Sequence, residues 1–287
     1  MVVKTDLDLL VIELEKWIKT QAHLPQMIEK TLIKRFVYSM FGDLEGAKKL
    51  LELNYEMRNK HPQIFLQRDP MDENSQRLLQ VADLVPLPGL TPEKNKLLFY
   101  RLIDFDADKF NFTDGVKVFF MIADCRFALE DEAGMSDGEV PIFDMAGFSL
   151  RHVTKIVFSA LRIYMKFVQE AHPVRLKEIH VLNCPSYLDK VMMVVKPFIK
   201  SEVFKLIHFH LPNAATPFEY FPQAMLAEEY GGKAGKMASL KAEWMSNLSE
   251  KREYLMDANR WKMDKTKRNA EASTKNLSTK LQNLEID

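Results

Sequence analysis

Four short β-prone runs between residues 97 and 210 constrain the fold more than any other feature of the sequence. They read LLFYRLID, EVPIFDM, EIHVLN and LIHFH, and segments long enough for helices separate them. Strands that alternate with helices pack as layers of one α/β domain. The sequence therefore predicts an α/β fold for this part of the chain.

The segment between the first two runs, TDGVKVFFMIADCRFALED, is compatible with a strand over VFFMI or with a helix. Lys117 and Asp124 lie seven residues apart and share one helical face, and Thr113 or Asp114 is suited to an N-cap. These features favour a helix.

The segment SLRHVTKIVFSALRIYMKFVQEA, residues 149–171, has the clearest helical pattern in the chain. Its apolar positions recur every three or four residues, and its basic positions lie within about 60° of one another on a helical wheel. The apolar face consists of Leu150, Val153, Val157, Leu161, Tyr164 and Val168, and the basic face of Arg151, Lys155, Arg162 and Lys166. We expect one amphipathic helix here.

Residues 6–83 have a helical pattern throughout. Apolar residues recur at helical spacing in DLDLLVIELEKWI, in MIEKTLIKRFVYSM and in DLEGAKKLLELNYEMRNK. Asp43 is suited to cap the third helix, and His61-Pro62 to end it. The next stretch, DLVPLPGLTPEK, has three prolines and a glycine, which is typical of a connection. We expect a helical N-terminal unit at 1–84 and a second domain at 95–235.

The rest of the chain, residues 236–287, is polar and rich in lysine. Its end, KTKRNAEASTKNLSTKLQNLEID, is expected to be frayed or disordered. Four apolar positions are suited to docking on the rest of the protein: Trp244, Leu248, Leu255 and Trp261. The sequence predicts a helical, partly disordered C-terminal tail.

Composition excludes several classes of partner and compartment. Lys+Arg and Asp+Glu both number 40, so no net basic field favours nucleic acid. Two cysteines, Cys125 and Cys184, are too few for a disulfide framework and fit a reducing compartment. The N-terminus, MVVKTDLDLLVIELEKW, has four acidic residues within its apolar stretch, and no run of about 18 uncharged apolar residues occurs. We expect a cytoplasmic protein that associates with membranes peripherally.

Catalytic motifs are weak or missing. GGKAGK, residues 231–236, is one residue short of the phosphate-loop spacing, and Met237 stands where a metal-binding hydroxyl is needed. Neither G-x-G-x-x-G nor G-x-S-x-G occurs. No nucleophile, base and oxyanion donor can be assembled, so the sequence predicts a protein that is not an enzyme and uses no cofactor.

Three histidines and one aspartate are candidates for metal-binding or catalytic groups. His208 and His210 share one face of a predicted strand, and His180 lies on a neighbouring run. Hydrogen-bonded histidines are the stronger interpretation, because no cysteine or carboxylate lies beside them at ligand spacing. Asp144 follows PIF and fits a turn better than a catalytic acid. We predict no metal site.

The run KVMMVVKPFIKSEVF, Lys190 to Phe204, has an unusual distribution of apolar residues. Five apolar residues in a row, 191–195, sweep past a full helical turn, so that no side of such a helix is free of apolar surface. Two interpretations are open on this pattern alone. Either the helix fills an ordinary core with methionines as gap fillers, or it faces protein on one side and an apolar ligand or membrane on the other.

Three separated motifs resemble those of a known family. The runs DGEVPIFDMAGFSL, HPVRLKEIHVLNCPSYLDKVMMVVKPFIK and EEYGG, between about Leu97 and Gly232, look like a CRAL-TRIO lipid-binding domain, of the branch of the alpha-tocopherol transfer protein and cellular retinaldehyde-binding protein. The upstream stretch LIKRFVYSMFGDLEGAKKLLELNYEMRNKHPQIF resembles the helical N-terminal unit of that family. The resemblance implies a mixed β-sheet that floors an apolar pocket, closed by a helical gate at about Cys184–Lys205.

The resemblance also implies two sets of site residues. The apolar ligand would be bound by Phe119, Ile122, Ala123, Phe143, Phe148, Leu161, Tyr164, Ile179, Val181, Val191, Val194, Val195, Phe198, Ile199 and Val203. Phosphoinositide headgroups would be bound by Arg175, Lys177, Lys196, Lys200 and Lys205. The second set departs from the family pattern, because Glu202 and Leu206 stand where relatives carry basic residues. The pocket wall offers few hydroxyls, so Tyr164 and Ser159 are the side chains suited to a polar ligand group.

The expected function is that of an intracellular carrier. It would bind a hydrophobic small molecule, such as a retinoid, carotenoid, tocopherol-like or other isoprenoid lipid, and exchange it at anionic membranes that contain phosphoinositides. The alternative is a phosphoinositide-sensing adaptor without transfer activity. An α/β hydrolase-like enzyme is disfavoured because no catalytic constellation can be assembled.

Overall fold

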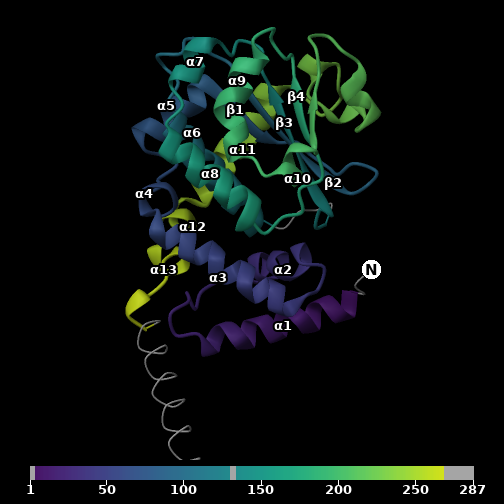
Figure 1. The fold of residues 1–287 in the computed structure, drawn as a ribbon. Coiled ribbons are helices and arrows are strands. Elements are labelled where there is room, and N and C mark those ends of the chain that lie inside the picture. The colour runs from purple at the N-terminus through teal and green to yellow at the C-terminus, as the bar shows by residue number, and fades with distance from the viewer. Residues whose placement is uncertain (1–3, 130–133, 268–287) are drawn as a thin grey trace, which may run out of the picture.

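The computed structural model describes residues 4–129 and 134–267, and its first part is the helical unit that the sequence predicts (Figure 1). Asp43 caps the third helix as expected, because its carboxylate accepts a hydrogen bond from the N–H of Gly46 at 3.0 Å. The helix ends at His61, where Pro62 begins the next. The helices are α1 (Lys4–Thr20), α2 (Lys30–Ser39), α3 (Leu44–Lys60), α4 (Pro62–Phe65) and α5 (Glu73–Val81).

A five-stranded sheet follows, and the four predicted runs form four of its strands. Strand order equals chain order, with β1 and β2 antiparallel and the other neighbours parallel. The strands are β1 (Ala82–Pro86), β2 (Asn95–Leu102), β3 (Gly138–Asp144), β4 (Ile179–Leu182) and β5 (Ile207–Phe209). The sheet is therefore mixed, as the resemblance implies.

The expectation of an irregular connection over DLVPLPGLTPEK is wrong for its first part. Ala82–Pro86 is strand β1, and it pairs with β2 from Ala82 opposite Leu102 to Pro86 opposite Leu98. Because β1 is an edge strand, it needs hydrogen-bond partners on one side only and tolerates a proline at its end. The helical unit therefore stops at Val81.

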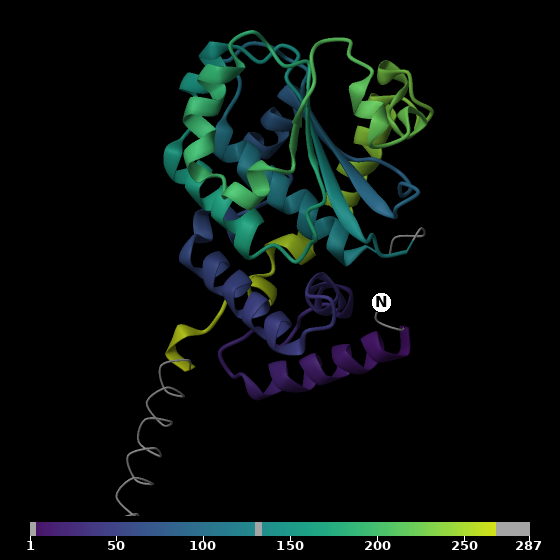
Figure 2. The ribbon, with the colours of Figure 1, turned by 45° about the vertical axis from the view of Figure 1, so that its right-hand side comes forward.

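The connecting helices all lie on one face of the sheet. Sequential parallel strands joined by right-handed crossovers place every crossover on the same side. The crossover elements are α6 (Phe112–Ala128), α7 (Leu150–Thr154), α8 (Phe158–Glu170), α9 (Leu188–Val195), η1 (Lys196–Phe198) and α10 (Ser201–Phe204). Figure 2 shows the strands between this layer and the later part of the chain. The opposite face is covered by η2 (Thr216–Glu219), η3 (Gln223–Met225), η4 (Glu228–Tyr230) and α11 (Met237–Glu250).

Two helices differ in detail from the prediction. The segment from Phe112 is helical as expected, but Asn111 caps it by accepting from the N–H of Asp114 at 3.0 Å. The predicted helix over 149–171 is two helices, α7 and α8, which meet at a break around Lys155–Val157. Thr154, Ile156 and Val157 are β-branched at this point, and such residues lower helix propensity. The break leaves two residues of the expected apolar face, Leu150 and Val157, exposed.

The C-terminal segment returns to the N-terminal unit. After α11 come α12 (Arg252–Met256) and α13 (Ala258–Trp261), which lie beside α3 and α4 in Figure 1. All four predicted docking points are engaged: Leu248, Leu255 and Trp261 are buried, and the Trp244 indole donates to the Pro86 carbonyl at 2.9 Å. The predicted disorder of the tail concerns residues that lie, from 268 onward, outside the described part.

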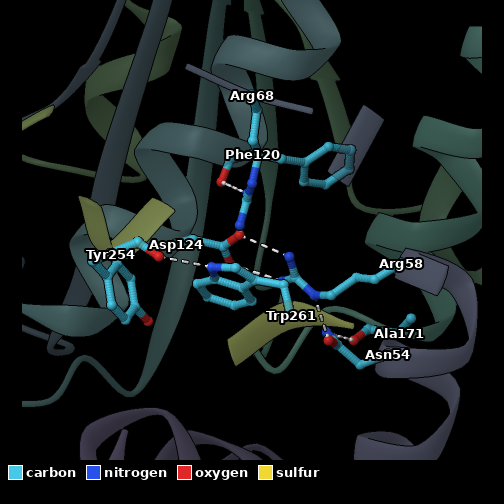
Figure 3. A network of polar contacts seen from close by, with 8 residues as sticks. All are labelled: Asn54, Arg58, Arg68, Phe120, Asp124, Ala171, Tyr254 and Trp261. Atoms are coloured by element: carbon cyan, nitrogen blue, oxygen red, sulfur yellow. Dashed lines mark hydrogen bonds and ion pairs between the residues drawn. The ribbon is translucent and has the colours of Figure 1, made fainter. Parts of the chain in front are cut away.

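A buried ionic cluster joins the three parts of the chain (Figure 3). Arg58 of α3 donates two hydrogen bonds to the carboxylate of Asp124 on α6, at 2.8 and 2.7 Å. Arg68 donates to the same carboxylate and to the Phe120 carbonyl. The ring of Trp261 lies 4.6 and 4.7 Å from the two guanidinium carbons. Helical unit, α/β domain and C-terminal segment thus share one set of contacts.

Within residues 4–129 and 134–267, no helix is both long and apolar enough to cross a membrane.

Candidate functional site

The gate expected from the sequence is the crossover between β4 and β5, and it is built from α9, η1 and α10. It packs chiefly against α7 and α8 of its own layer. Phe198 of η1 lies 6.3 Å from Phe158 of α8, measured between ring centroids. The strongest contacts of the gate are therefore with the helices beside it.

Polar contacts attach the far end of the gate to the end of α8. The Gln169 side chain donates from Nε2 to the Phe198 carbonyl at 2.9 Å and accepts from the N–H of Lys200 at 2.8 Å. The Lys200 ammonium lies 3.0 Å from a carboxylate oxygen of Glu170. These contacts connect the backbone of the gate to one turn of a neighbouring helix.

The near end of the gate begins at a turn after β4. Asn183 adopts a left-handed backbone with φ of 51°, and its side chain donates to Asp144 at 2.8 Å. Asp144 also accepts from the N–H of Ala146 at 2.8 Å and from the Tyr230 hydroxyl at 2.5 Å. The aspartate is therefore a turn residue, as predicted. Tyr187, at the start of α9, donates to the carbonyl of Phe148.

The two faces of the sheet differ in burial. On the face covered by α11, Val140, Ile142 and Leu182 are buried. On the gate side of the same central strands, Phe143, Ile179 and Val181 stay partly exposed, although a layer of helices lies over them. Within the described chain, none of the four buried apolar clusters includes a gate residue or one of these three side chains. The gate side of these strands is therefore covered less completely than the side that faces α11.

The structure brings most of the predicted ligand-binding residues to this side. Those with partly exposed side chains are Phe119, Phe143, Phe148, Tyr164, Ile179, Val181, Val194, Val195, Phe198, Ile199 and Val203, whereas Ala123, Leu161 and Val191 are buried. Ile122 is placed elsewhere, because it packs in a filled cluster with Leu78 and Leu79 of α5 and Leu248 of α11.

Sequence reasoning missed Tyr100 on this face. Its ring stacks on Phe143 at 5.0 Å, and Phe119 lies 5.7 Å away. The period of two along β2 places Tyr100 on the side of its parallel partner Phe143, so strand pairing was the signal that could have found it. Gln169 was missed as well, because its role depends on where the gate folds back.

Some apolar side chains are exposed on the gate layer, among charged ones such as Asp189 and Lys190. Met193 of α9 is 71% exposed, and three apolar side chains on the helices beside it are exposed too. We call Leu150, Val157, Phe158 and Met193 the outer apolar patch. On α9 itself the exposed residues are Asp189, Lys190 and Met193, so the interpretation that the gate is apolar on two sides stays a prediction.

The five predicted headgroup residues fall into two groups. Lys196, Lys200 and Lys205 are exposed on the gate. Arg175 and Lys177 lie just before β4, at the same strand-start end of the sheet as Lys205, and both form ion pairs with Asp137 at 2.8 Å. Two of the three gate lysines have partners, because Lys196 lies over the Phe204 ring and Lys200 pairs with Glu170.

Arg175 also contacts the helical unit. Its guanidinium donates to the carbonyl of Tyr38 and lies 4.2 and 3.7 Å from the ring centroids of Tyr38 and Phe41. A small hollow is lined here by Arg35, Tyr38, Asp137 and Arg175, among others. The Nε of Arg175 is a buried donor without a partner. A second hollow lies on the helical unit, between α1 and α3.

His180 and His210 are hydrogen-bonded, as the stronger interpretation held, whereas the His208 ring stacks on His180. His180 Nδ1 lies 3.0 Å from His210 Nε2, and His210 Nδ1 lies 2.8 Å from the Thr216 hydroxyl. Burial, and then His210 and His208, lowers the pKa of His180 to about 3. No group of three or more metal-ligating side chains was found among the residues that the structure describes.

Comparisons with known proteins agree with this architecture. Residues 82–232 match the family model described as CRAL/TRIO domain, and residues 4–75 match the model described as Pinta-like, UBA domain. The crystal structure of Sfh5 shares the fold, with a TM-score of 0.53 at 14% identity over 88% of this chain and 98% of that one.

In the curated relatives the match covers a smaller share of the relative's own length. The alpha-tocopherol transfer protein-like protein of Homo sapiens is 22% identical over 230 residues, which are 80% of this chain and 66% of the relative. Clavesin-1 of Xenopus laevis is 24% identical over 208 residues, 71% of this chain and 61% of the relative. This chain thus spans just under two thirds of the relatives it matches. Because the matching model covers more than half of its residues, the chain belongs to the CRAL/TRIO domain family of lipid-binding and lipid-transfer proteins.

Proposed function

We propose that this protein is a non-enzymatic carrier that encloses one hydrophobic small molecule between its sheet and its gate and exchanges it at a membrane surface. The cargo would be an isoprenoid-type lipid such as a retinoid, carotenoid or tocopherol-like molecule. The observation that carries the proposal is the unequal burial of the sheet. Phe143, Ile179 and Val181 lie under a layer of helices and yet stay partly exposed, which a hollow between the sheet and the gate would explain.

Desolvation supplies the binding energy. Burying about 300 Å² of apolar ligand surface at roughly 25 cal/mol/Å² is worth several kcal/mol. The walls are aromatic and branched aliphatic side chains, which is the usual lining of a small-molecule site. The protein holds such a ligand because water rejects it, and no covalent or catalytic step is required.

Exchange requires the gate to move. Its inner side faces the sheet, and Met193 on its outer side adds to the outer apolar patch, which a bilayer can receive. The exposed gate lysines add about 1 kcal/mol each near an anionic surface. The described part of the chain spans no membrane by a helix, so contact at a surface is the mode that its helices allow.

The test is organic extraction of the purified protein after incubation with cell-membrane lipids, with native mass spectrometry of the unextracted protein. A carrier retains one lipid per chain. Val194→Asp and Phe198→Asp place a charge on the gate among apolar groups and should each abolish retention. Ile12→Asp, a change of a comparably apolar but exposed residue on α1, should retain lipid normally. Full retention by both gate variants would contradict the proposal.

One observation favours a second function, that of a phosphoinositide-sensing adaptor. The hollow at Arg175 joins a buried unpaired guanidinium nitrogen with a second basic residue, Lys177, at its edge. An anionic headgroup there would compete with Asp137 for both cations. In the adaptor the gate-side space would hold structural lipid or none.

Vesicle sedimentation separates the two functions. The pair Arg175→Ala/Lys177→Ala should lose binding to phosphatidylinositol 4,5-bisphosphate vesicles if the headgroup binds there. Arg151→Ala/Lys155→Ala is the matched control, since those residues share Asp108 as Arg175 and Lys177 share Asp137. Lost vesicle binding with no lipid retained by the wild type would favour the adaptor. Retained lipid with unchanged vesicle binding would support the carrier and contradict the adaptor.

A further inference from the structure

Two tyrosines on the gate side of the sheet have no hydrogen-bond partner. Tyr100 stands on β2, and Tyr164 stands on the middle of α8. The ring of Phe119 links them, at 5.7 Å from Tyr100 and 5.0 Å from Tyr164 between centroids. Phe143 completes the group by stacking on Tyr100. The four rings come from two layers, β2 and β3 of the sheet and α6 and α8 of the helices that cover it.

Other tyrosines of the chain show what these two lack. Tyr38 donates to Asp137, Tyr230 donates to Asp144, and Tyr187 donates to a backbone carbonyl. The Tyr55 hydroxyl has no partner, but it is sealed in the helical unit. Tyr100 and Tyr164 form no hydrogen bond with any residue of the described chain, and their oxygens are not among its sealed, unpaired polar atoms.

Both hydroxyls are shielded from bulk water. Burial raises the pKa of Tyr164 above its usual range, and burial followed by the nearby Tyr164 raises that of Tyr100. A phenol can be surrounded by protein, lack a partner and still have open space beside it. Such a phenol faces an internal hollow. A buried hydroxyl without a partner is unfavourable, so a ligand atom or water is needed there.

The charged groups nearby are already paired. Arg126 donates to Glu139, and both side chains are buried next to this space on the same side of β3 as Phe143. A ligand carboxylate would need a free cation to offset its burial, and Arg126 is bound to Glu139. The phenols are the groups left to bind a ligand, and they suit a neutral oxygen that accepts or donates one hydrogen bond.

We propose that Tyr100 and Tyr164 bind the polar end of the cargo, which is therefore a lipid with a neutral oxygen function, an alcohol or a carbonyl, on an otherwise apolar body. This assignment rests on the carrier function proposed above. The aromatic rings around the hydroxyls pack against the first carbons of the chain, and the gate covers the rest. A hydrocarbon of the same shape leaves both hydroxyls unpaired and binds less tightly.

Three lipids with one carbon skeleton test the proposal: phytol, phytane and phytanic acid, supplied in phosphatidylcholine vesicles. Retention by the protein is measured by extraction and mass spectrometry. Wild type should retain phytol at least tenfold better than phytane or phytanic acid. Tyr100→Phe and Tyr164→Phe should each lower phytol retention about threefold to tenfold, and the double variant should bring it to the level of phytane. Phytane retention should not change.

Tyr55→Phe is the matched control, because it removes the oxygen of a sealed tyrosine away from the sheet. Its phytol retention should equal that of wild type, and unchanged unfolding midpoints show that all variants fold. Three outcomes overturn the assignment but not the carrier function. They are equal retention of phytol and phytane by wild type, unchanged phytol retention in the double variant, and a preference for phytanic acid. Retention of none of the three overturns the isoprenoid carrier and this assignment together.

Discussion

The Oε1 atom of Gln169 lies 2.8 Å from the backbone nitrogen of Lys200, and the same side chain donates to the carbonyl of Phe198. One amide group thus satisfies an N–H and a C=O on either side of Ile199. The gate cannot leave α8 without breaking both bonds. This side chain therefore contributes directly to the difference in free energy between the closed and the open gate.

Replacing Gln169 with Ala should free the gate. Each hydrogen bond is worth roughly 0.5–1.5 kcal/mol net, so the two together favour the closed gate by about 1–3 kcal/mol. Amide hydrogen exchange in residues 188–204, followed by mass spectrometry, should accelerate about tenfold or more. Gln26→Ala removes a glutamine that bonds three carbonyls in the helical unit and should leave the gate unchanged. Identical exchange in both variants would rule out the attachment.

Met193→Asp should weaken binding to anionic vesicles. The side chain is 71% exposed in the outer apolar patch, so the change leaves folding stability nearly intact while placing a charge where a bilayer would be entered. Flotation with phosphatidylserine vesicles should show at least a tenfold loss. Met27→Asp, at a residue 53% exposed on the helical unit, is the control and should bind like wild type. Equal losses in the two variants would mean that the patch has no special role.

How far the sequence predicts this fold depends on which forces decide each element. The β-prone runs and the helical repeats are local signals, and β2 to β5 and α3 with its Asp43 cap follow them. Strand β1 was missed because the three prolines of DLVPLPGLTPEK suggest a turn, whereas an edge strand tolerates Pro86 at its end. The break between α7 and α8 was missed because an apolar repeat continues across it.

The candidate site was predicted less completely, for a physical reason. The apolar run 191–195 predicts a helix with apolar residues on every side, and in the structure Val191 is buried whereas Met193 is 71% exposed. It does not show which side chains stay partly exposed inside, because that depends on how layers from distant segments pack. Arg175 illustrates the limit: its partners Tyr38 and Asp137 lie 137 and 38 residues away in sequence.

Asp124→Asn should destabilise the protein strongly. Burial acts to raise the pKa of Asp124, but Arg58 and Arg68 outweigh it and hold the pKa below its usual range. Removing the carboxylate charge leaves two buried guanidinium groups without a counter-ion, which costs about 3–5 kcal/mol of unfolding free energy. Urea unfolding measures the loss. Asp108→Asn, at an exposed aspartate that pairs with Arg151 and Lys155, should change stability little. A small effect at both positions would mean that the cluster is not a structural junction.

His172 should make stability depend on pH in mildly acidic solution. It is buried among the rings of Phe119, Phe127 and Phe167, and burial lowers its pKa to about 4 from 6.5. Between these values the unfolded chain binds a proton that the folded protein excludes, so this contribution to stability is complete above pH 6.5 and falls as the pH drops to 4. His172→Phe lacks this contribution. The free energy of unfolding of wild type, relative to that of the variant, should therefore fall by about 2 kcal/mol between pH 7 and 5. Urea unfolding at pH 7, 6 and 5 measures this difference. Phe127→Leu disturbs the same rings without removing a titratable group, so its stability should run parallel to that of wild type. A His172→Phe curve that also runs parallel would show that the imidazole titrates normally in the folded protein.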